Sequence, residues 1–275
     1  MKFKIKVNKT QLDFLSHEQV DNTKLIKNIL SGKTYPLINH VEPKVIIDIG
    51  ANIGATSVFF ALNYKKAKIF SFEPSSINYE LLAQNVKKLK NVVALNCGVF
   101  DKDKTEKIYI DKSSPGRNSI FKHWTDSEEF EQIKLINFRD FIKVNEIKSI
   151  DILKIDTEGC EVPILRSIAD YISSIKLLYL EYHSEEDKSF IKSLLGKTHF
   201  VLRDIVVGSS EINLNENVLD KKCMENVFQG NELIIKKGDI IERKHLHRLK
   251  TVRKKIIVRS QELGEIIYLN KVYRK

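Results

Sequence analysis

The sequence has few cysteines and no long apolar run. Cys97, Cys160 and Cys223 lie far apart in the 275 residues and form no CxxC pair. This spacing argues against a disulfide framework or a zinc site and favours a reducing compartment. No stretch approaches the roughly 18 apolar residues of a membrane-spanning helix, and "MKFKIKVNKTQLDFL" lacks the apolar core of a signal peptide. We therefore expect a soluble, cytoplasmic protein.

Positive charge is concentrated at one end of the chain. Residues 239–275 contain eleven Lys and Arg against four Asp and Glu, so this segment carries +7 of the net charge of +10. The preceding 238 residues are close to balanced. A basic tail of this kind indicates a contact with an anionic partner or a solvated helix, rather than a property of the whole domain.

Short apolar runs alternate with helical patterns over most of the chain. After residues 1–43, in which "NTKLIKNILSG" predicts a short helix, the runs "VIIDI", "AKIFSF", "NVVALNC", "IDILKID" and "IKLLYLEYH" are typical of buried strands. Amphipathic stretches separate them. The runs "HFVLRDIVV" and "NELIIKK" predict two last strands paired with each other. This alternation predicts an α/β fold with a parallel sheet.

The stretch "VIIDIGANIG" ends the first of these strands in a glycine turn. A dinucleotide site needs G-x-G-x-x-G, but Asn52 and Ala55 occupy its second and third glycine positions. Asp48, Gly50 and Gly54 instead place an acid two residues before the first glycine. An acid there suits the cationic amino-acid end of S-adenosylmethionine and would repel a pyrophosphate. A simple tight connection is the alternative explanation.

The next two strands end in polar side chains at the same edge of the predicted sheet. Glu73 can accept hydrogen bonds from both ribose hydroxyls, and Asn96 and Cys97 would lie near an adenine edge. Ligands bind at the carboxyl ends of parallel strands. The three strand ends together predict a nucleoside site.

Several separated blocks resemble the FkbM-type methyltransferases: "DIGANIG", "FEPSSINYELLAQN", "LKIDTEGCE" and "LYLEYH". The resemblance covers roughly residues 44–205. It implies a Rossmann-like seven-stranded methyltransferase sheet with helices on both faces and an antiparallel last strand. It also implies S-adenosylmethionine as cofactor and O-methylation of a hydroxyl on a saccharide, glycolipid or related metabolite. By position, Asp48, Gly50, Asn52 and Gly54 would line the methionine side and Glu73 would hold the ribose. The methyltransferase domain would span 44–237, between an N-terminal extension (1–43) and a basic C-terminal arm (238–275).

Proton removal from the acceptor needs a base, and the ends of the fourth and fifth strands offer candidates. Asp156 ends "LKID", and Glu158 follows it; Glu158 and Glu161 could instead serve only to cap a helix. His183 stands at the open end of "LEYH", two residues after Glu181. We predict Asp156, Glu158 and His183 as catalytic residues. Oxygen ligands there would suit magnesium, but no spacing demands it, and no metal is assigned.

Two further segments bear on the acceptor. The loop "SSPGRNS" predicts a lid, in which Arg117 could hold an anionic acceptor. In the arm, Ile241, Leu249, Val252, Ile256 and Leu263 recur at roughly helical spacing. Such a helix would pack on the body or another subunit, or contact a membrane surface or nucleic acid. An RNA methyltransferase, a non-catalytic nucleotide-binding module and a dinucleotide oxidoreductase remain alternative functions.

Overall fold

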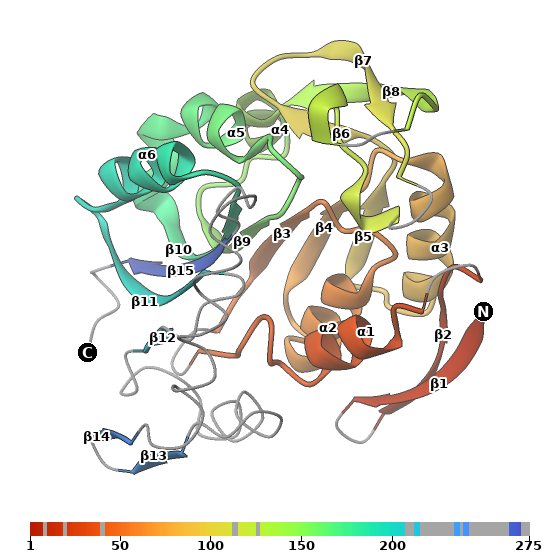
Figure 1. The fold of residues 1–275 in the computed structure, drawn as a ribbon, viewed down its shortest axis with the longest axis horizontal. Coiled ribbons are helices and arrows are strands. Elements are labelled where there is room, and N and C mark those ends of the chain that lie inside the picture. The colour runs from red at the N-terminus through yellow and green to blue at the C-terminus, as the bar shows by residue number, and fades with distance from the viewer. Residues whose placement is uncertain are drawn as a thin grey trace, which may run out of the picture.

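A large mixed sheet forms the centre of the computed structural model (Figure 1), which describes residues 1–7, 10–18, 21–38, 42–111, 115–124, 127–206, 212–214, 234–236, 239–241 and 264–270. Its strand order is β12-β11-β15-β10-β9-β3-β4-β5. The strands are β3 (Val45–Ile49), β4 (Lys68–Phe72), β5 (Val92–Leu95), β9 (Ile150–Ile155), β10 (Ile175–Tyr182), β11 (His199–Val206), β12 (Ile212–Leu214) and β15 (Gly264–Asn270).

Strand direction in this sheet confirms the predicted fold class. β3, β4, β5, β9 and β10 are mutually parallel, and β15 runs antiparallel between β10 and β11. Apart from the three-residue edge strand β12, this is a seven-stranded sheet with its last strand antiparallel. Strand order reverses between β3 and β9, which places a ligand site at the carboxyl ends of these two strands.

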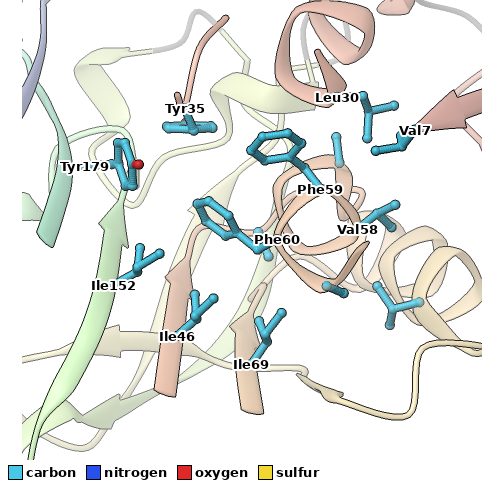
Figure 2. Close-up of a cluster of buried hydrophobic side chains, with 14 of the residues drawn as sticks. Val7, Leu30, Tyr35, Ile46, Val58, Phe59, Phe60, Ile69, Ile152 and Tyr179 are labelled. Carbon is cyan, nitrogen blue, oxygen red and sulfur yellow. The ribbon is translucent and has the colours of Figure 1, made fainter. Parts of the chain in front are cut away.

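Helices cover both faces of the sheet (Figure 1). One face carries α1 (Thr23–Leu30), α2 (Ala55–Asn63) and α3 (Ser76–Val86), and the other carries α4 (Phe138–Val144), α5 (Glu161–Ser167) and α6 (Glu185–Leu195). Each face has its own core of buried side chains. Figure 2 shows Phe60 of α2 on the side of the strands that carry Ile46, Ile69 and Ile152, whereas Phe59 lies nearer Leu30 of α1. Strands buried on both faces explain the continuous apolar runs in the sequence.

The N-terminal extension packs against the helices that cover one face of the large sheet. β1 (Lys2–Val7) and β2 (Thr10–Leu15) form an antiparallel hairpin that the sequence analysis did not predict. Asn85 of α3 joins it to the body: its Oδ1 accepts from the Leu15 N–H at 2.7 Å, and its Nδ2 donates to the carbonyls of Leu15 and Ile53. Buried Phe14 and Ile26 belong to the same core as α2.

In the part of the chain that the structure describes, a small three-stranded sheet, three 3-10 helices and a short strand pair lie outside the large sheet. β6 (Gly98–Phe100), β8 (Phe130–Asn137) and β7 (Lys104–Tyr109) form a separate three-stranded sheet above β5 (Figure 1). Single 3-10 turns lie at η1 (Pro115–Arg117), η2 (Lys122–Trp124) and η3 (Ala169–Ser174), and β13 (Ile234–Lys236) pairs with β14 (Asp239–Ile241). Among the described residues, no helix is long and apolar enough to cross a membrane.

Two expectations for the C-terminal part are wrong. "HFVLRDIVV" does not pair with "NELIIKK": β11 pairs with β12 and β15, whereas β13 pairs with β14. Residues 264–270 do not belong to a separate arm, because they form β15 inside the large sheet, with Ile266, Ile267 and Tyr268 almost fully buried. Of the expected amphipathic helix, Ile241 lies in β14, and residues 242–263 lie outside the described residues.

Candidate active site

The glycine turn after β3 is shaped by contacts with the protein itself. Gly50 has φ +76°, and a Cβ built on it would lie 1.8 Å from the carbonyl oxygen of Asp156. The N–H groups of Gly50 and Ala51 both donate to the Phe72 carbonyl, at 3.0 and 2.9 Å. Gly54 has φ +90° and packs against Leu82 of α3. Both positions therefore need glycine to bring the ends of β3, β4 and β9 together.

Beneath this turn, Lys154 forms buried ion pairs with two aspartates and hydrogen bonds with the backbone of the turn. Lys154, 2% exposed, lies 3.3 Å from Asp48 Oδ1 and 3.4 Å from Asp156 Oδ2, and it donates to the carbonyls of Ile49 and Gly50 at 3.2 and 2.5 Å. Asp48 is fully buried and also accepts from Ser57 Oγ at 2.6 Å. Its carboxylate thus faces the protein interior, and its influence on any bound ligand passes through Lys154 and the turn.

Glu73 ends β4 beside this turn. Its Oε2 accepts from the Asn52 N–H at 2.8 Å, and its Oε1 accepts from the Ser75 N–H at 3.0 Å. Burial raises the pKa of Glu73 to about 7, although these two N–H donors favour its ionised form. A carboxylate has about four lone-pair sites. The two N–H groups and the side chain of Asn78 occupy three of them, so about one remains for a hydroxyl donor. Asn96 lies beyond it, with Nδ2 donating to the carbonyls of Glu73 and Pro74.

A cleft of about 670 Å³, including its opening to solvent, runs across these strand ends. Among the predicted residues, Gly50, Asn52, Glu73, Asp156 and Glu158 line it. Asp48, Gly54, Asn96, Cys97 and His183 are not among its lining residues. Apolar side chains of the small sheet and its neighbours form the opposite wall: Val99, Ile108, Ile120, Ile133 and Leu135. The cleft is therefore polar along the strand ends and apolar on the other side, as a nucleoside requires.

The predicted lid loop reaches this cleft. Gly116 and Asn118 line it, and Ser119 Oγ donates to the Glu158 carbonyl at 2.7 Å. Arg117 is exposed and is not among the lining residues. Its expected contact with an anionic acceptor stays a prediction.

A cluster of ionisable groups lies at the ends of β9 and β10. His183 Nε2 is 3.3 Å from Glu158 Oε2 and 3.8 Å from Glu181 Oε2, and His183 Nδ1 is 3.4 Å from Glu161 Oε2. Glu158 has φ +53°, an uncommon backbone conformation for a residue other than glycine. Thus the fourth and fifth strand ends come together as the sequence predicts.

Mutual proximity shifts the pKa values of these groups. Burial would lower the pKa of His183, but hydrogen bonding to Glu158 and Glu161 outweighs it and raises that pKa to about 10. Burial and the charge of Asp156 raise the pKa of Glu181 well above its usual range. Burial also opposes ionisation of Asp156, but the charge of Lys154 and the hydrogen bonds from Glu181 and Tyr35 together lower its pKa to about 2. With this pKa, both ring nitrogens of His183 carry a proton at neutral pH. In this state His183 cannot accept a proton from the acceptor hydroxyl.

The sequence analysis missed Tyr35, which comes from the N-terminal extension. Its hydroxyl donates to Asp156 Oδ2 at 3.0 Å, and its ring lies edge-on to Tyr179 at 5.5 Å (Figure 2). A second, smaller cavity, of about 300 Å³ including its opening to solvent, lies between Tyr35, Tyr179, Asp156 and Glu181. No local pattern in "GKTYP" marks this role, since it depends on a contact between residues 121 positions apart.

The strand order and the polar strand ends define a Rossmann-like fold with a ligand site at the carboxyl ends of β3, β4 and β9. The model of the family described as "Methyltransferase FkbM domain" matches residues 48–205, and the chain belongs to this family. The predicted family membership is therefore confirmed, and the protein is a methyltransferase.

Relatives of known name are distant. "Methyltransferase sdnD" of Sordaria araneosa is 25% identical over 58% of this chain and 73% of its own length. "Hexuronic acid methyltransferase AglP" of Haloferax volcanii is 25% identical over 57% of this chain and 63% of its own length. Among solved structures, the methyltransferase FkbM of Methylobacillus flagellatus aligns with a TM-score of 0.42 and 17% identity, over 58% of this chain and 40% of that one.

Proposed function

We propose that the protein transfers a methyl group from S-adenosylmethionine to a hydroxyl of a saccharide, glycolipid or related metabolite. The observation that carries this proposal is the cleft lined by Glu73 after β4, by Asp156 and Glu158 after β9, and by apolar side chains of the small sheet. The 25% identity to a hexuronic acid methyltransferase supports a saccharide acceptor.

The donor half of the proposal rests on Glu73 and the β3 turn. Glu73 has about one acceptor site left for a ribose hydroxyl, and Gly50 and Asn52 line the adjoining part of the cleft. The amino-acid end would then lie over the turn that Lys154 and Asp48 brace from below. Val99, Ile133 and Leu135 offer an apolar surface for the base.

The acceptor half rests on Asp156 and Glu158. Both carboxylates line the cleft and accept hydrogen bonds from hydroxyl groups. In such a transfer the methyl group would move from the sulfonium sulfur to the acceptor oxygen, the methyl carbon–sulfur bond would break, and S-adenosylhomocysteine would leave. Asp156 and Glu158 would orient the hydroxyl, and its proton would pass to a carboxylate or to solvent. Holding the two reactants in line accounts for most of the rate gain expected of such a site.

A labelling experiment tests the proposal. The protein is incubated with methyl-labelled S-adenosylmethionine and a panel of uronic acids, neutral saccharides, glycolipids and RNA. We expect label in a saccharide fraction, and labelled RNA or no labelled product at all would refute the proposal.

Two variants connect the reaction to this cleft. Asp156→Asn keeps the shape of the side chain but removes a carboxylate from the cleft wall. It should lower turnover by about 10²- to 10⁴-fold while donor affinity changes little. Exposed Asp101 provides the control, because Asp101→Asn should retain wild-type turnover.

A further inference from the structure

The cluster at the ends of β9 and β10 has the spacing of a metal-binding site. Glu158, Glu181 and His183 each offer one ligand atom, and these three atoms lie within 4.8 Å of one another. Around an octahedral ion with bonds of about 2.1 Å, ligand atoms lie about 3 Å apart when adjacent and about 4.2 Å apart when opposite. An ion between the three side chains would therefore need only small side-chain shifts.

The far side of the imidazole is already oriented for such a role. Ligating histidines commonly direct their second ring N–H at a carboxylate, and here His183 Nδ1 faces Glu161 Oε2 at 3.4 Å. Glu161 is 2% exposed and is itself held in place by the N–H groups of Thr157 and Gly159 and by the Thr157 hydroxyl. This arrangement keeps Nδ1 turned to Glu161 and directs Nε2 at Glu158 and Glu181.

The two glutamates of this cluster line cavities that a ligand could enter. Glu158 lines the large cleft, and Glu181 lines the smaller cavity beside Tyr35. Both glutamate side chains are 18% exposed, whereas His183 is 1% exposed. An ion held here would have three protein ligands and free coordination positions towards both cavities, which is the arrangement of a site that also binds substrate.

We propose that Glu158, Glu181 and His183 bind one divalent transition-metal ion, for which Mn²⁺ is the natural probe. Carboxylates suit Mg²⁺, Ca²⁺ and Mn²⁺ alike, but the imidazole nitrogen favours a transition metal. The ion takes the place of the proton on His183 Nε2, and the Nδ1–H remains directed at Glu161.

The ion would also define how the acceptor binds, a consequence that rests on the proposed function. Two free positions suit adjacent oxygens of a saccharide, either two hydroxyls or a hydroxyl and a carboxylate. Coordination makes a hydroxyl more acidic. With Glu158 on the ion, Asp156 is the cleft carboxylate left to accept a hydrogen bond from that hydroxyl and orient it.

Binding of Mn²⁺ alone tests the site without any methyl acceptor. We expect electron paramagnetic resonance titration to show about one bound Mn²⁺ per chain. Glu158→Gln and Glu181→Gln should each weaken binding at least tenfold, and Glu161→Gln by about 10- to 100-fold. Exposed Glu186, three residues beyond His183, is the matched control, and Glu186→Gln should leave the affinity unchanged.

Pulsed resonance on the wild-type complex keeps the proposal testable even if a variant fails to fold. A coordinated imidazole gives a nitrogen coupling to Mn²⁺. Absence of that coupling, absence of binding, or wild-type affinity in both Gln variants would overturn the metal site. If Mn²⁺ binds but no acceptor is labelled, the proposed function fails alone. If the titration shows no Mn²⁺ binding, but chelator-treated protein still labels an acceptor at the full rate, the metal site fails and the proposed function stands.

Discussion

Replacing Lys154 with methionine should both destabilise the protein and disturb the β3 turn. The ammonium is 2% exposed and lies within 3.4 Å of the carboxylates of Asp48 and Asp156. Methionine fills the same space but leaves these two acids facing each other without a cation. Breaking a buried ion pair from one side costs about 3–5 kcal/mol. At about 2–4 °C per kcal/mol for a chain of this size, the melting temperature should fall by about 6–20 °C.

Thermal denaturation followed by circular dichroism measures this effect. Lys143→Met is the control, because Lys143 is 64% exposed and lies 3.9 Å from Asp140; exposed pairs contribute about 0–1 kcal/mol. Lys154→Met should also weaken binding of S-adenosylmethionine, since the ammonium holds the carbonyls of Ile49 and Gly50. A melting temperature within about 2 °C of wild type would refute the reasoning that this network supports the site.

Three further changes test other parts of the site. Gly50→Ala should lower stability by more than about 2 kcal/mol in urea denaturation, because its Cβ would lie 1.8 Å from the Asp156 carbonyl oxygen at a φ of +76°. Tyr35→Phe should reduce stability by about 1 kcal/mol and lower kcat more than it changes the Kd of the donor; unchanged kcat would exclude a positioning role. Donor affinity, measured by calorimetry, should fall about 30-fold from pH 8 to pH 5.5, because Glu73, with a pKa of about 7, must be ionised to accept from ribose; a flat profile would count against that contact.

The sequence predicted the parallel half of the fold because each strand there carries its own signal. "VIIDI" and "IDILKI" are buried on both faces, so hydrophobicity alone marks them.

What the sequence did not reveal depends on contacts between distant segments. β15 begins at Gly264, far along the chain from its partners β10 and β11. The sequence "GEIIYLN" contains no local pattern that indicates which strands it pairs with. Asp48 was predicted to meet the donor directly, but its burial against Lys154 and Ser57 is a property of three elements packed together. The contact between Tyr35 and Asp156 is of the same kind.

The central claim is that the donor lies over the ends of β3 and β4 with its ribose on Glu73. Calorimetric titration of S-adenosylmethionine into wild type, Glu73→Ala and Glu80→Ala tests it most directly, since Glu80 is an exposed glutamate on the following helix. One hydrogen bond to a charged group contributes about 1.5–3 kcal/mol, so Glu73→Ala should bind at least about 10-fold more weakly, whereas Glu80→Ala should match wild type. Equal affinity in all three proteins, or no binding by wild type, would contradict the account.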